Sequence, residues 1–248
     1  MFYIVANWKM NKDSKLSESF INEIDSFDHY DPSKINVIIS PPTIYLSQFK
    51  NSKTNLAAQN ISHYSNGPYT GEISSKMVSE YVSYVIIGHS ERRRFFCETD
   101  EFISKKINQC NNENLKSIVC FGESFEIRNK SNHLDFIRKQ LECIIDSYDK
   151  SNINNLLLAY EPVWAIGSGN SATIQEICEV HNFTRSILND NFGKIIGDSV
   201  PIIYGGSCTK VNAKSILNSF NVNGLLIGGA SLDLSHFKAI IKEANEVT

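Results

Sequence analysis

The sequence lacks long apolar segments and any strong excess of charge. No apolar run approaches the roughly 20 residues that a helix needs to cross a bilayer. Met1 leads directly into the apolar residues 2–6, without the basic stretch and cleavage site of a signal peptide. The formal net charge of −3 excludes the strongly basic surface typical of nucleic-acid-binding proteins. We therefore expect no membrane partner, no nucleic-acid partner and a cytoplasmic location.

Cysteine pairing motifs and dinucleotide-binding motifs are also missing. The six cysteines are scattered, none forms a C-x-x-C pair and no histidine cluster lies beside them: Cys97, Cys110, Cys120, Cys143, Cys178 and Cys208. This pattern predicts free thiols in a reducing compartment, with neither a disulfide scaffold nor a zinc site. Cys120 follows the apolar run Ile118-Val119 and has no neighbouring base, so we interpret it as a packing residue.

The chain does contain a repeated alternation of short β-branched runs and longer helical stretches. It has 248 residues, of which 42% are apolar, so it can bury a sizeable core. Eight strands are predicted, at residues 2–6, 36–40, 55–59, 84–88, 116–121, 156–160, 200–204 and 224–228. Several of these runs, such as VII at 85–87 and LLL at 156–158, are apolar without alternation. Such runs are typical of parallel strands that are buried on both faces.

Helical periodicity fills the intervals between the predicted strands. Apolar residues recur at spacings near three and four in three such intervals: Leu16, Phe20, Ile24 and Phe27; Phe136, Leu141, Ile144 and Ile145; and Ile177, Val180, Phe183 and Ile187. The intervals are long enough for the crossover that a parallel pair requires. Eight such units predict an α/β protein, a closed (β/α)8 barrel that forms one domain over residues 1–248. A doubly wound open sheet is the alternative, but it usually carries a G-x-G-x-x-G turn that is missing here.

In such a barrel the functional residues follow the strands, at their carboxyl ends. Asn7 and Lys9 follow the first strand and point the same way if the alternation continues. A lysine at this position can hold an anion and stabilise negative charge on a reacting oxygen. Taken alone, the tripeptide is equally compatible with a surface lysine beside a packed Trp8.

Histidine and glutamate follow the fourth and sixth strands. We predict Ser90 as a helix N-cap with Glu91 in the first turn, which places His89 beside a helix N-terminus that disfavours imidazolium. Pro162 restricts the backbone of Glu161, and the apolar loop that follows can cover its carboxylate and raise its pKa. A turn histidine without a role and a strand-end glutamate in a salt bridge remain open alternatives.

Two Gly-Gly turns follow the seventh and eighth predicted strands. Tyr204 precedes Gly205-Gly206-Ser207, and the last strand ends in Gly228-Gly229. Glycine lets backbone N–H groups approach an oxyanion closely, and in barrels the phosphate site commonly lies after these two strands. Two glycine pairs at these two places indicate a phosphate site.

These segments together resemble the triosephosphate isomerase family. The matching stretches run through the whole chain in order: NWK at 7–9, AQN at 58–60, YTGEIS at 69–74, VIIGHSERR at 85–93, CFGES at 120–124, AYEPVWAIGSG at 159–169, YGGS at 204–207 and GLLIGGASL at 224–232. The resemblance implies a TIM barrel that interconverts dihydroxyacetone phosphate and D-glyceraldehyde 3-phosphate, in glycolysis and gluconeogenesis, without a metal ion or an organic cofactor.

The resemblance also implies a role for each residue of the site. Glu161 is expected to be the catalytic base, His89 the group that polarises the carbonyl, and Lys9 the cation that holds the anionic substrate. The remaining expected site residues bind substrate, support the catalytic groups or latch a lid: Asn7, Gly167, Ser207, Gly228, Gly229, Glu91, Ser90 and Tyr204. At the far end of the lid this chain has Ser168, Asn170 and Ser171, where the family more often has Thr, Lys and Thr.

A homodimer is the expected assembly. Residues 60–71 form a loop longer than the usual strand-to-helix connection, with polar turn residues around two tyrosines, Tyr64 and Tyr69. The resemblance implies that this loop inserts beside Asn7 and His89 of the other subunit, with Thr70 in contact and an ion pair between Glu72 and Arg92.

Two other functions remain open. One is another phosphosugar barrel, such as an epimerase or a Schiff-base aldolase, although an aldolase needs a strand-end lysine where Glu161 stands. The other is a catalytically idle barrel that serves as a binding protein.

Overall fold

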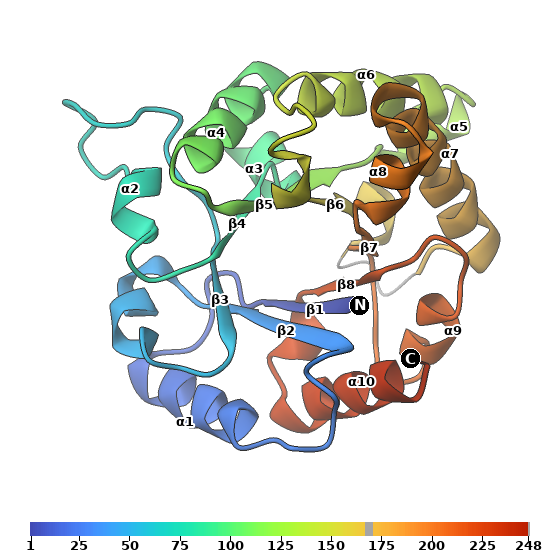
Figure 1. Ribbon diagram of the computed structural model, residues 1–248. Helices are drawn as coiled ribbons and strands as arrows, with labels where there is room; N and C mark the ends of the chain where they lie inside the picture. The colour runs from blue at the N-terminus through green and yellow to red at the C-terminus, as the bar shows by residue number, and fades with distance from the viewer. Residues whose placement is uncertain (167–170, 248) are drawn as a thin grey trace.

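The strands of the protein pair in parallel and close into a barrel in chain order (Figure 1). The computed structural model describes residues 1–166 and 171–247. Within these ranges the barrel consists of β1 (Phe2–Asn7), β2 (Ile35–Ser40), β3 (Asn55–Ala58), β4 (Tyr84–Ile87), β5 (Lys116–Phe121), β6 (Leu156–Tyr160), β7 (Ile202–Tyr204) and β8 (Gly224–Ile227). The predicted (β/α)8 barrel is confirmed, and each predicted strand agrees with the observed one to within two residues at either end.

Strand register brings the carboxyl ends of the strands to one mouth of the barrel. Asn7 at the end of β1 pairs with Ser40 at the end of β2. Tyr160 at the end of β6 pairs with both Phe121 of β5 and Tyr204 of β7. Residues that follow different strands, far apart in the sequence, therefore surround a single opening.

Apolar and polar residues do not alternate in the strands because both faces of each strand are buried, one in each of two separate cores. Side chains that point into the barrel form one cluster, which includes Val5, Ile38, Ile86, Ile118 and Leu157. Their neighbours along each strand form the larger cluster between the barrel and the helices. Cys120 lies in the inner cluster and is fully buried, and this burial holds the pKa of its thiol well above the ordinary value. The prediction that Cys120 is a packing residue is confirmed.

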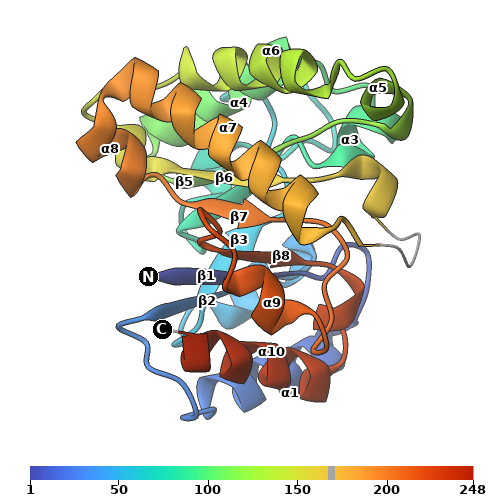
Figure 2. The ribbon, with the colours of Figure 1, turned by 90° about the vertical axis from the view of Figure 1, so that its right-hand side faces the viewer.

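Helices surround the strands on all sides, as Figures 1 and 2 show from two directions. In the described residues they are α1 (Ser14–Asp25), α2 (Ser75–Val78), α3 (Ser90–Phe95), α4 (Asp100–Asn112), α5 (Phe125–Asn129), α6 (His133–Ile145), α7 (Ile174–Phe192), α8 (Lys194–Ser199), α9 (Ala213–Leu217) and α10 (Leu234–Val247). Short 3-10 turns accompany them: η1 (Thr43–Phe49), η2 (Ile153–Asn155), η3 (Val163–Ala165) and η4 (Gly229–Ser231). None of the helices in the described part of the chain is long and apolar enough to cross a membrane.

The buried face of α1 differs from the predicted one. Leu16 is 58% exposed, and Phe27 lies beyond the end of the helix. The buried residues are Ser17, Phe20, Ile21 and Ile24, which recur at three and four positions as one helical face requires. Leu16 is off this face because it lies one position before Ser17, about 100° around the helix.

Side-chain caps fix where the long helices begin. Asp13 accepts a hydrogen bond from the backbone N–H of Leu16 at the start of α1. Thr173 and Glu176 form a reciprocal capping box at the start of α7. The second cap matters for the site, because it anchors the chain just after the loop that follows β6.

A fully buried histidine lies on α7 behind the barrel wall. The Nδ1 atom of His181 is 2.9 Å from the carbonyl oxygen of Asn221, and its ring packs edge-on against Tyr160. Its Nε2 atom has no hydrogen-bond partner among the described residues. Burial lowers the pKa of His181 to about 4, so this side chain remains neutral in the folded protein at neutral pH.

The buried His181 predicts a loss of stability in mild acid. An unfolded histidine titrates near pH 6.5, so between about pH 6.5 and 4 the unfolded chain binds one more proton than the folded chain. We expect the free energy of unfolding to fall by up to about 3 kcal/mol over this window, measured by urea unfolding at one protein concentration. His181→Gln should show a shallower pH dependence, whereas the control His29→Gln, at an exposed position, should not. Equal slopes for wild type and His181→Gln would contradict the prediction.

Candidate active site

A cavity of about 420 Å³ opens at the mouth of the barrel. Residues from several strand ends line it together. Asn7 and Lys9 come from the end of β1, His89 follows β4 and Glu161 follows β6. Ser207 follows β7, and Gly228 and Gly229 follow β8. These predicted site residues thus converge, whereas Gly167, Ser168 and Asn170 lie outside the described residues.

The Glu161 carboxylate is buried at the floor of this cavity. Only 2% of Glu161 is exposed. Its backbone N–H donates to the carbonyl oxygen of Phe121 at 2.7 Å, which continues the pairing of β6 with β5. Its Oε2 atom accepts a hydrogen bond from the backbone N–H of Ser90 at 2.8 Å, and its Oε1 atom lies 3.0 Å from His89 Nε2. The second contact is primarily electrostatic, since Oε1 has no well-directed hydrogen bond.

The pKa of Glu161 is lowered in this arrangement, so the prediction of a raised pKa is wrong. Burial does raise the pKa of the Glu161 carboxyl group, as expected. The nearby His89 ring, the Ser90 N–H and the Lys9 charge favour the ionised form and together outweigh the burial. The prediction considered only the apolar cover and missed the donors that surround the carboxylate.

The local structure around His89 also differs from the prediction. The N-cap of α3 is His89 itself and not Ser90, because the His89 Nδ1 atom accepts the backbone N–H of Glu91 at 3.2 Å. This bond makes Nδ1 an acceptor and leaves Nε2 to carry the ring proton, facing Glu161. Burial lowers the pKa of His89. The Glu161 carboxylate and the charge of Glu91 raise this pKa by more than burial lowers it, so the net shift is upward. The downward shift predicted from the helix N-terminus is therefore wrong.

Lys9 is held in an unusual backbone conformation. Its φ angle is 53°, in the left-handed region that non-glycine residues rarely adopt. The Asn7 side chain accepts the Lys9 backbone N–H at 3.1 Å, and the Gln59 amide donates to the carbonyl oxygens of Lys9 and Ser40, each at 2.9 Å. The Lys9 ammonium group pairs with Glu91 Oε1 at 2.6 Å. Gln59 belongs to the AQN stretch, but no role was predicted for it from the sequence.

The Gly205-Gly206 turn leaves room for the groups around it. A Cβ atom at Gly205 would lie 2.9 Å from Glu161 Cγ, and one at Gly206 would lie 2.2 Å from the Tyr204 hydroxyl oxygen. At Gly229, by contrast, a Cβ atom would meet nothing within 4 Å. Gly205 and Gly206 are thus needed for packing beneath the site. From the sequence we had predicted only a role in phosphate binding for this glycine pair.

Two polar clusters flank the loop that follows Glu161. Glu123, fully buried, accepts hydrogen bonds from the Tyr160 hydroxyl and the Trp164 indole N–H, both at 3.1 Å, and pairs with Arg128 at 2.9 Å. At the other end of the loop, the Tyr204 hydroxyl accepts the backbone N–H of Ala172 at 3.3 Å. Glu123 lies in the CFGES stretch, yet the sequence gave no sign that it contacts Trp164.

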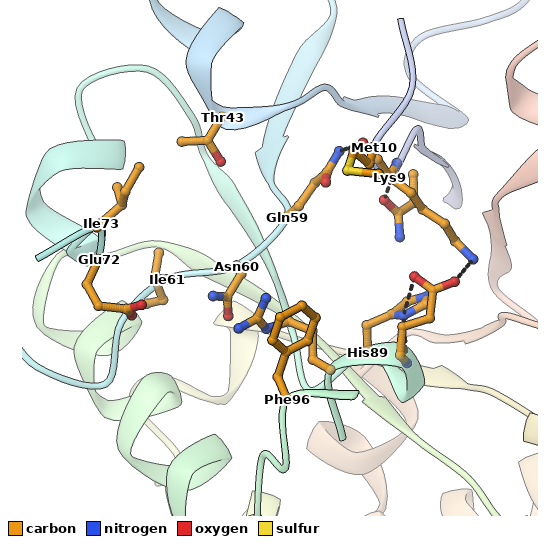
Figure 3. Close-up of a pocket in the computed structure, with 14 residues that line it drawn as sticks. Lys9, Met10, Thr43, Gln59, Asn60, Ile61, Glu72, Ile73, His89 and Phe96 are labelled. Atoms are coloured by element: carbon orange, nitrogen blue, oxygen red, sulfur yellow. Dashed lines mark hydrogen bonds and ion pairs between the residues drawn. The ribbon is translucent and has the colours of Figure 1, made fainter. Parts of the chain in front are cut away.

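A second cavity, of about 500 Å³, adjoins the first (Figure 3). Lys9 and His89 lie on one side of it, and Glu72 and Ile73 on the other. Apolar side chains at its rim are strongly exposed: Met10 is 97% exposed and Phe96 65%. This cavity therefore has an apolar rim and shares three lining residues with the first cavity, Asn7, Lys9 and His89.

The segment 60–73 between β3 and α2 extends away from the ring of helices, at the left of Figure 1. Tyr64 and Tyr69, both exposed, stack on each other near its tip with ring centroids 3.8 Å apart. Within the chain Arg92 pairs with Glu98 at 2.5 Å. The ion pair predicted between Glu72 and Arg92 is not found among the described residues of one subunit and stays a prediction for contacts between copies.

Known proteins resemble this chain over nearly its full length. A family model described as triosephosphate isomerase matches residues 2–244. Triosephosphate isomerase of Alkaliphilus oremlandii (strain OhILAs) is 42% identical over 243 residues, which cover 96% of this chain and 97% of the relative. Those of Buchnera aphidicola subsp. Cinara cedri (strain Cc) and Francisella tularensis subsp. mediasiatica (strain FSC147) are 41% and 38% identical, over 98% of this chain and 98% and 97% of the relatives.

The close approach of Gly205 to Glu161 predicts a specific packing defect. In Gly205→Ala the added methyl group displaces the Glu161 side chain, and we expect the free energy of unfolding to fall by about 1–3 kcal/mol. The matched control Gly229→Ala, where the methyl group meets open space, should change it by less than about 0.5 kcal/mol. Chemical denaturation of both variants measures the difference, and equal stability of the two would refute this account of the turn.

Proposed function

The chain belongs to the triosephosphate isomerase family and interconverts dihydroxyacetone phosphate and D-glyceraldehyde 3-phosphate in glycolysis, and from this premise we propose that Glu161, His89 and Lys9 carry out the reaction. The observation that carries the proposal is the buried Glu161 carboxylate, which faces a cavity shared with both other side chains. Each of the three comes from the carboxyl end of a different strand, as catalytic residues of this fold do.

Proton transfer is the task proposed for Glu161. Its carboxylate takes a proton from one substrate carbon, and the electron pair of that C–H bond moves toward the carbonyl oxygen to form an enediolate. The same carboxyl group then returns the proton to the neighbouring carbon, while the hydroxyl proton on the oxygen of the first carbon passes to the former carbonyl oxygen through the His89 ring. The His89 ring and the Ser90 N–H lower the pKa of Glu161. A substrate that engages these donors removes that stabilisation and leaves the carboxylate a stronger base in a dry site.

His89 and Lys9 stabilise the negative charge that develops on the substrate oxygens. The Nε2 atom of His89 lies 3.0 Å from an oxygen atom of Glu161, and a substrate oxygen can take its place as the partner of the Nε2–H group. Lys9 projects into the same cavity and supplies a positive charge, and its contact with Glu91 fixes the ammonium group. Asn7 and Gln59 support this lysine through its backbone.

The phosphate group of the substrate binds at the opposite side of the cavity. Ser207, Gly228 and Gly229 follow β7 and β8 and line that side. Backbone N–H groups of such turns can donate to phosphate oxygens without competing side chains. Ile166 also lines the cavity and begins the cover of the site, and we propose that Gly167 adds a further backbone donor. Exclusion of water by such a cover protects the enediolate from loss of phosphate.

The base assignment is tested by Glu161→Gln, which keeps the shape of the side chain but removes the basic oxygen. We expect kcat to fall by at least about a thousandfold, equivalent to about 4 kcal/mol of barrier, because no other carboxylate lines this cavity within the described residues. The control Glu126→Gln, on the exposed surface of α5, should retain wild-type kcat. A coupled assay that follows NADH oxidation measures both, and one tenth of wild-type activity in Glu161→Gln would refute the assignment.

We further propose that two copies of the chain form a dimer in which the segment 60–73 of each enters the 500 Å³ cavity of the other. The cavity lies beside Lys9 and His89, and its exposed Met10 and Phe96 offer apolar surface to the stacked tyrosines. Thr70 of one copy would then lie near Asn7 and His89 of the other, and Glu72 could pair with Arg92 across the interface. The proposal makes catalysis dependent on assembly although each subunit has its own catalytic side chains.

A cytoplasmic location is proposed on the basis of the cysteines. All six are free thiols, and free thiols persist in reducing compartments. Glycolytic substrates are consistent with the same location.

If the dimer forms as proposed, a chain with a shortened segment 60–73 should fold but lose activity. Replacement of residues 64–69 by a short Gly-Ser link should give a folded monomer with kcat reduced at least about a hundredfold, through misplacement of Lys9 and His89. The same link at residues 149–152, an exposed turn before η2, serves as the control and should leave mass and activity unchanged. Analytical ultracentrifugation and the coupled assay measure the two effects, and a fully active monomer would disprove the dependence.

A further inference from the structure

The charges around the substrate cavity do not balance those of a phosphorylated substrate. Lys9 is the lysine that lines the cavity in the described residues, and Glu91 already pairs with it at 2.6 Å. Glu161 adds a second negative charge at the floor. The side-chain charges around a phosphate dianion in this cavity therefore do not sum to a positive charge. The two glycine turns offer the dianion only the dipoles of their backbone N–H groups.

One further titratable side chain lines the same cavity. His236 lies in the first turns of α10, just after the η4 turn that carries Gly229. It is half-buried, and no hydrogen bond or ion pair of its ring is found among the described residues, although its charge acts on the nearby Asp233 carboxylate. The ring nitrogens are therefore available to a ligand at the mouth of the cavity, on the side of the two glycine turns.

The position of His236 is fixed by its backbone. Asp233 Oδ1 accepts the backbone N–H of His236 at 2.8 Å and the Ser235 hydroxyl at 2.6 Å. These bonds anchor the first turn of α10 next to the turn formed by Gly228 and Gly229. Lys12 adds a second anchor, because its ammonium group donates to the carbonyl oxygen of Leu232 at 2.8 Å. The chain between β8 and α10 is thereby tied to the residues that follow β1.

We propose that His236 is a phosphate-binding residue of this enzyme, which in its protonated form contacts the phosphate group of the substrate at the outer edge of the cavity. The proposal rests on the proposed substrate site and adds to it an imidazole ring, which can carry a positive charge and donate to phosphate oxygens. It implies that the affinity for dianions, and with it KM, depends on the protonation of His236, whereas kcat depends on the groups at the floor.

Other charged groups around His236 act on the same dianion, and their effects must be distinguished from the effect of His236. They lie after β1, β4, β6 and β8: Lys9, Lys12, His89, Glu91, Glu161 and Asp233. Asp233 is the closest of them in sequence, and the charge of His236 contributes to lowering its pKa, after its hydrogen bonds to Ser235 and to the His236 backbone. Since all of these groups remain in a His236 variant, a comparison between variant and wild type isolates the contribution of one ring.

Inorganic sulfate is the probe for this test, because it stays a dianion across the pH range in which histidine titrates. Binding is measured by calorimetry at constant ionic strength, at about pH 6 and about pH 8.5, for wild type, His236→Asn and His236→Lys. We expect His236→Asn to bind sulfate about three- to fivefold more weakly than wild type at the lower pH and equally at the higher pH. His236→Lys should retain tight binding at both. In the isomerase assay His236→Asn should raise KM at the lower pH while kcat changes by less than about twofold.

The control is His29→Asn, at an exposed histidine that does not line the cavity. Equal sulfate affinity of wild type and His236→Asn at the lower pH would overturn the proposal, as would an equal loss in His29→Asn. Because calorimetry needs no turnover, this outcome is distinguishable from failure of the proposed catalytic roles, which would appear as an active Glu161→Gln. His236→Gln provides a second neutral variant should the first not fold.

Discussion

A carboxylate that is fully buried stays ionised only if charges and N–H groups replace the lost water, and the arrangement around Glu161 meets this constraint. The Ser90 N–H at 2.8 Å and the His89 ring at 3.0 Å both come from the turn after β4, and Lys9 adds charge from the end of β1. No single segment of the chain provides all of these groups. The closed barrel is the element that brings them together, because its register places three distant strand ends at one mouth.

Most of the fold was predictable because its strands are buried on both faces. Runs such as Leu156–Tyr160 have no alternation, and this indicated parallel strands that are covered by helices. That residues after different strands share one cavity was predictable for a related reason, since each follows a strand end directly, whereas their roles come from the family resemblance and stay proposals. Gln59 and Glu123 were not recognised, because their partners lie 50 and 41 residues away and neither sequence motif nor spacing reveals such contacts. The pKa shifts of Glu161 and His89 were mispredicted for the same reason, because in each case the interaction with the other group helps to outweigh the effect of burial.

A second buried charge cluster shows how the protruding segment is held at its base. Glu98 pairs with both Lys106 and Arg92 at 2.5 Å, and Lys106 also donates to the side chain of Asn60 at 2.7 Å. Asn60 is the residue at which the chain leaves β3 and enters the segment 60–73. Burial lowers the pKa of Lys106, and its contact with Glu98 offsets this only in part. The base of the segment is thus hydrogen-bonded to α4, whereas its tyrosines are exposed.

The left-handed backbone conformation of Lys9 connects the 500 Å³ cavity to the catalytic site. A residue with a φ angle of 53° costs conformational free energy and persists only where the surrounding structure determines it. Part of that support comes from Gln59, whose side chain holds the Lys9 carbonyl oxygen and also lines the 500 Å³ cavity. In a single subunit that cavity is open, so one side of the support faces water. In the proposed dimer the partner's segment fills it and restricts both side chains. The position of the Lys9 ammonium group would then depend on a contact that only the dimer provides. Each subunit would have all of its catalytic side chains, and activity would still require two subunits.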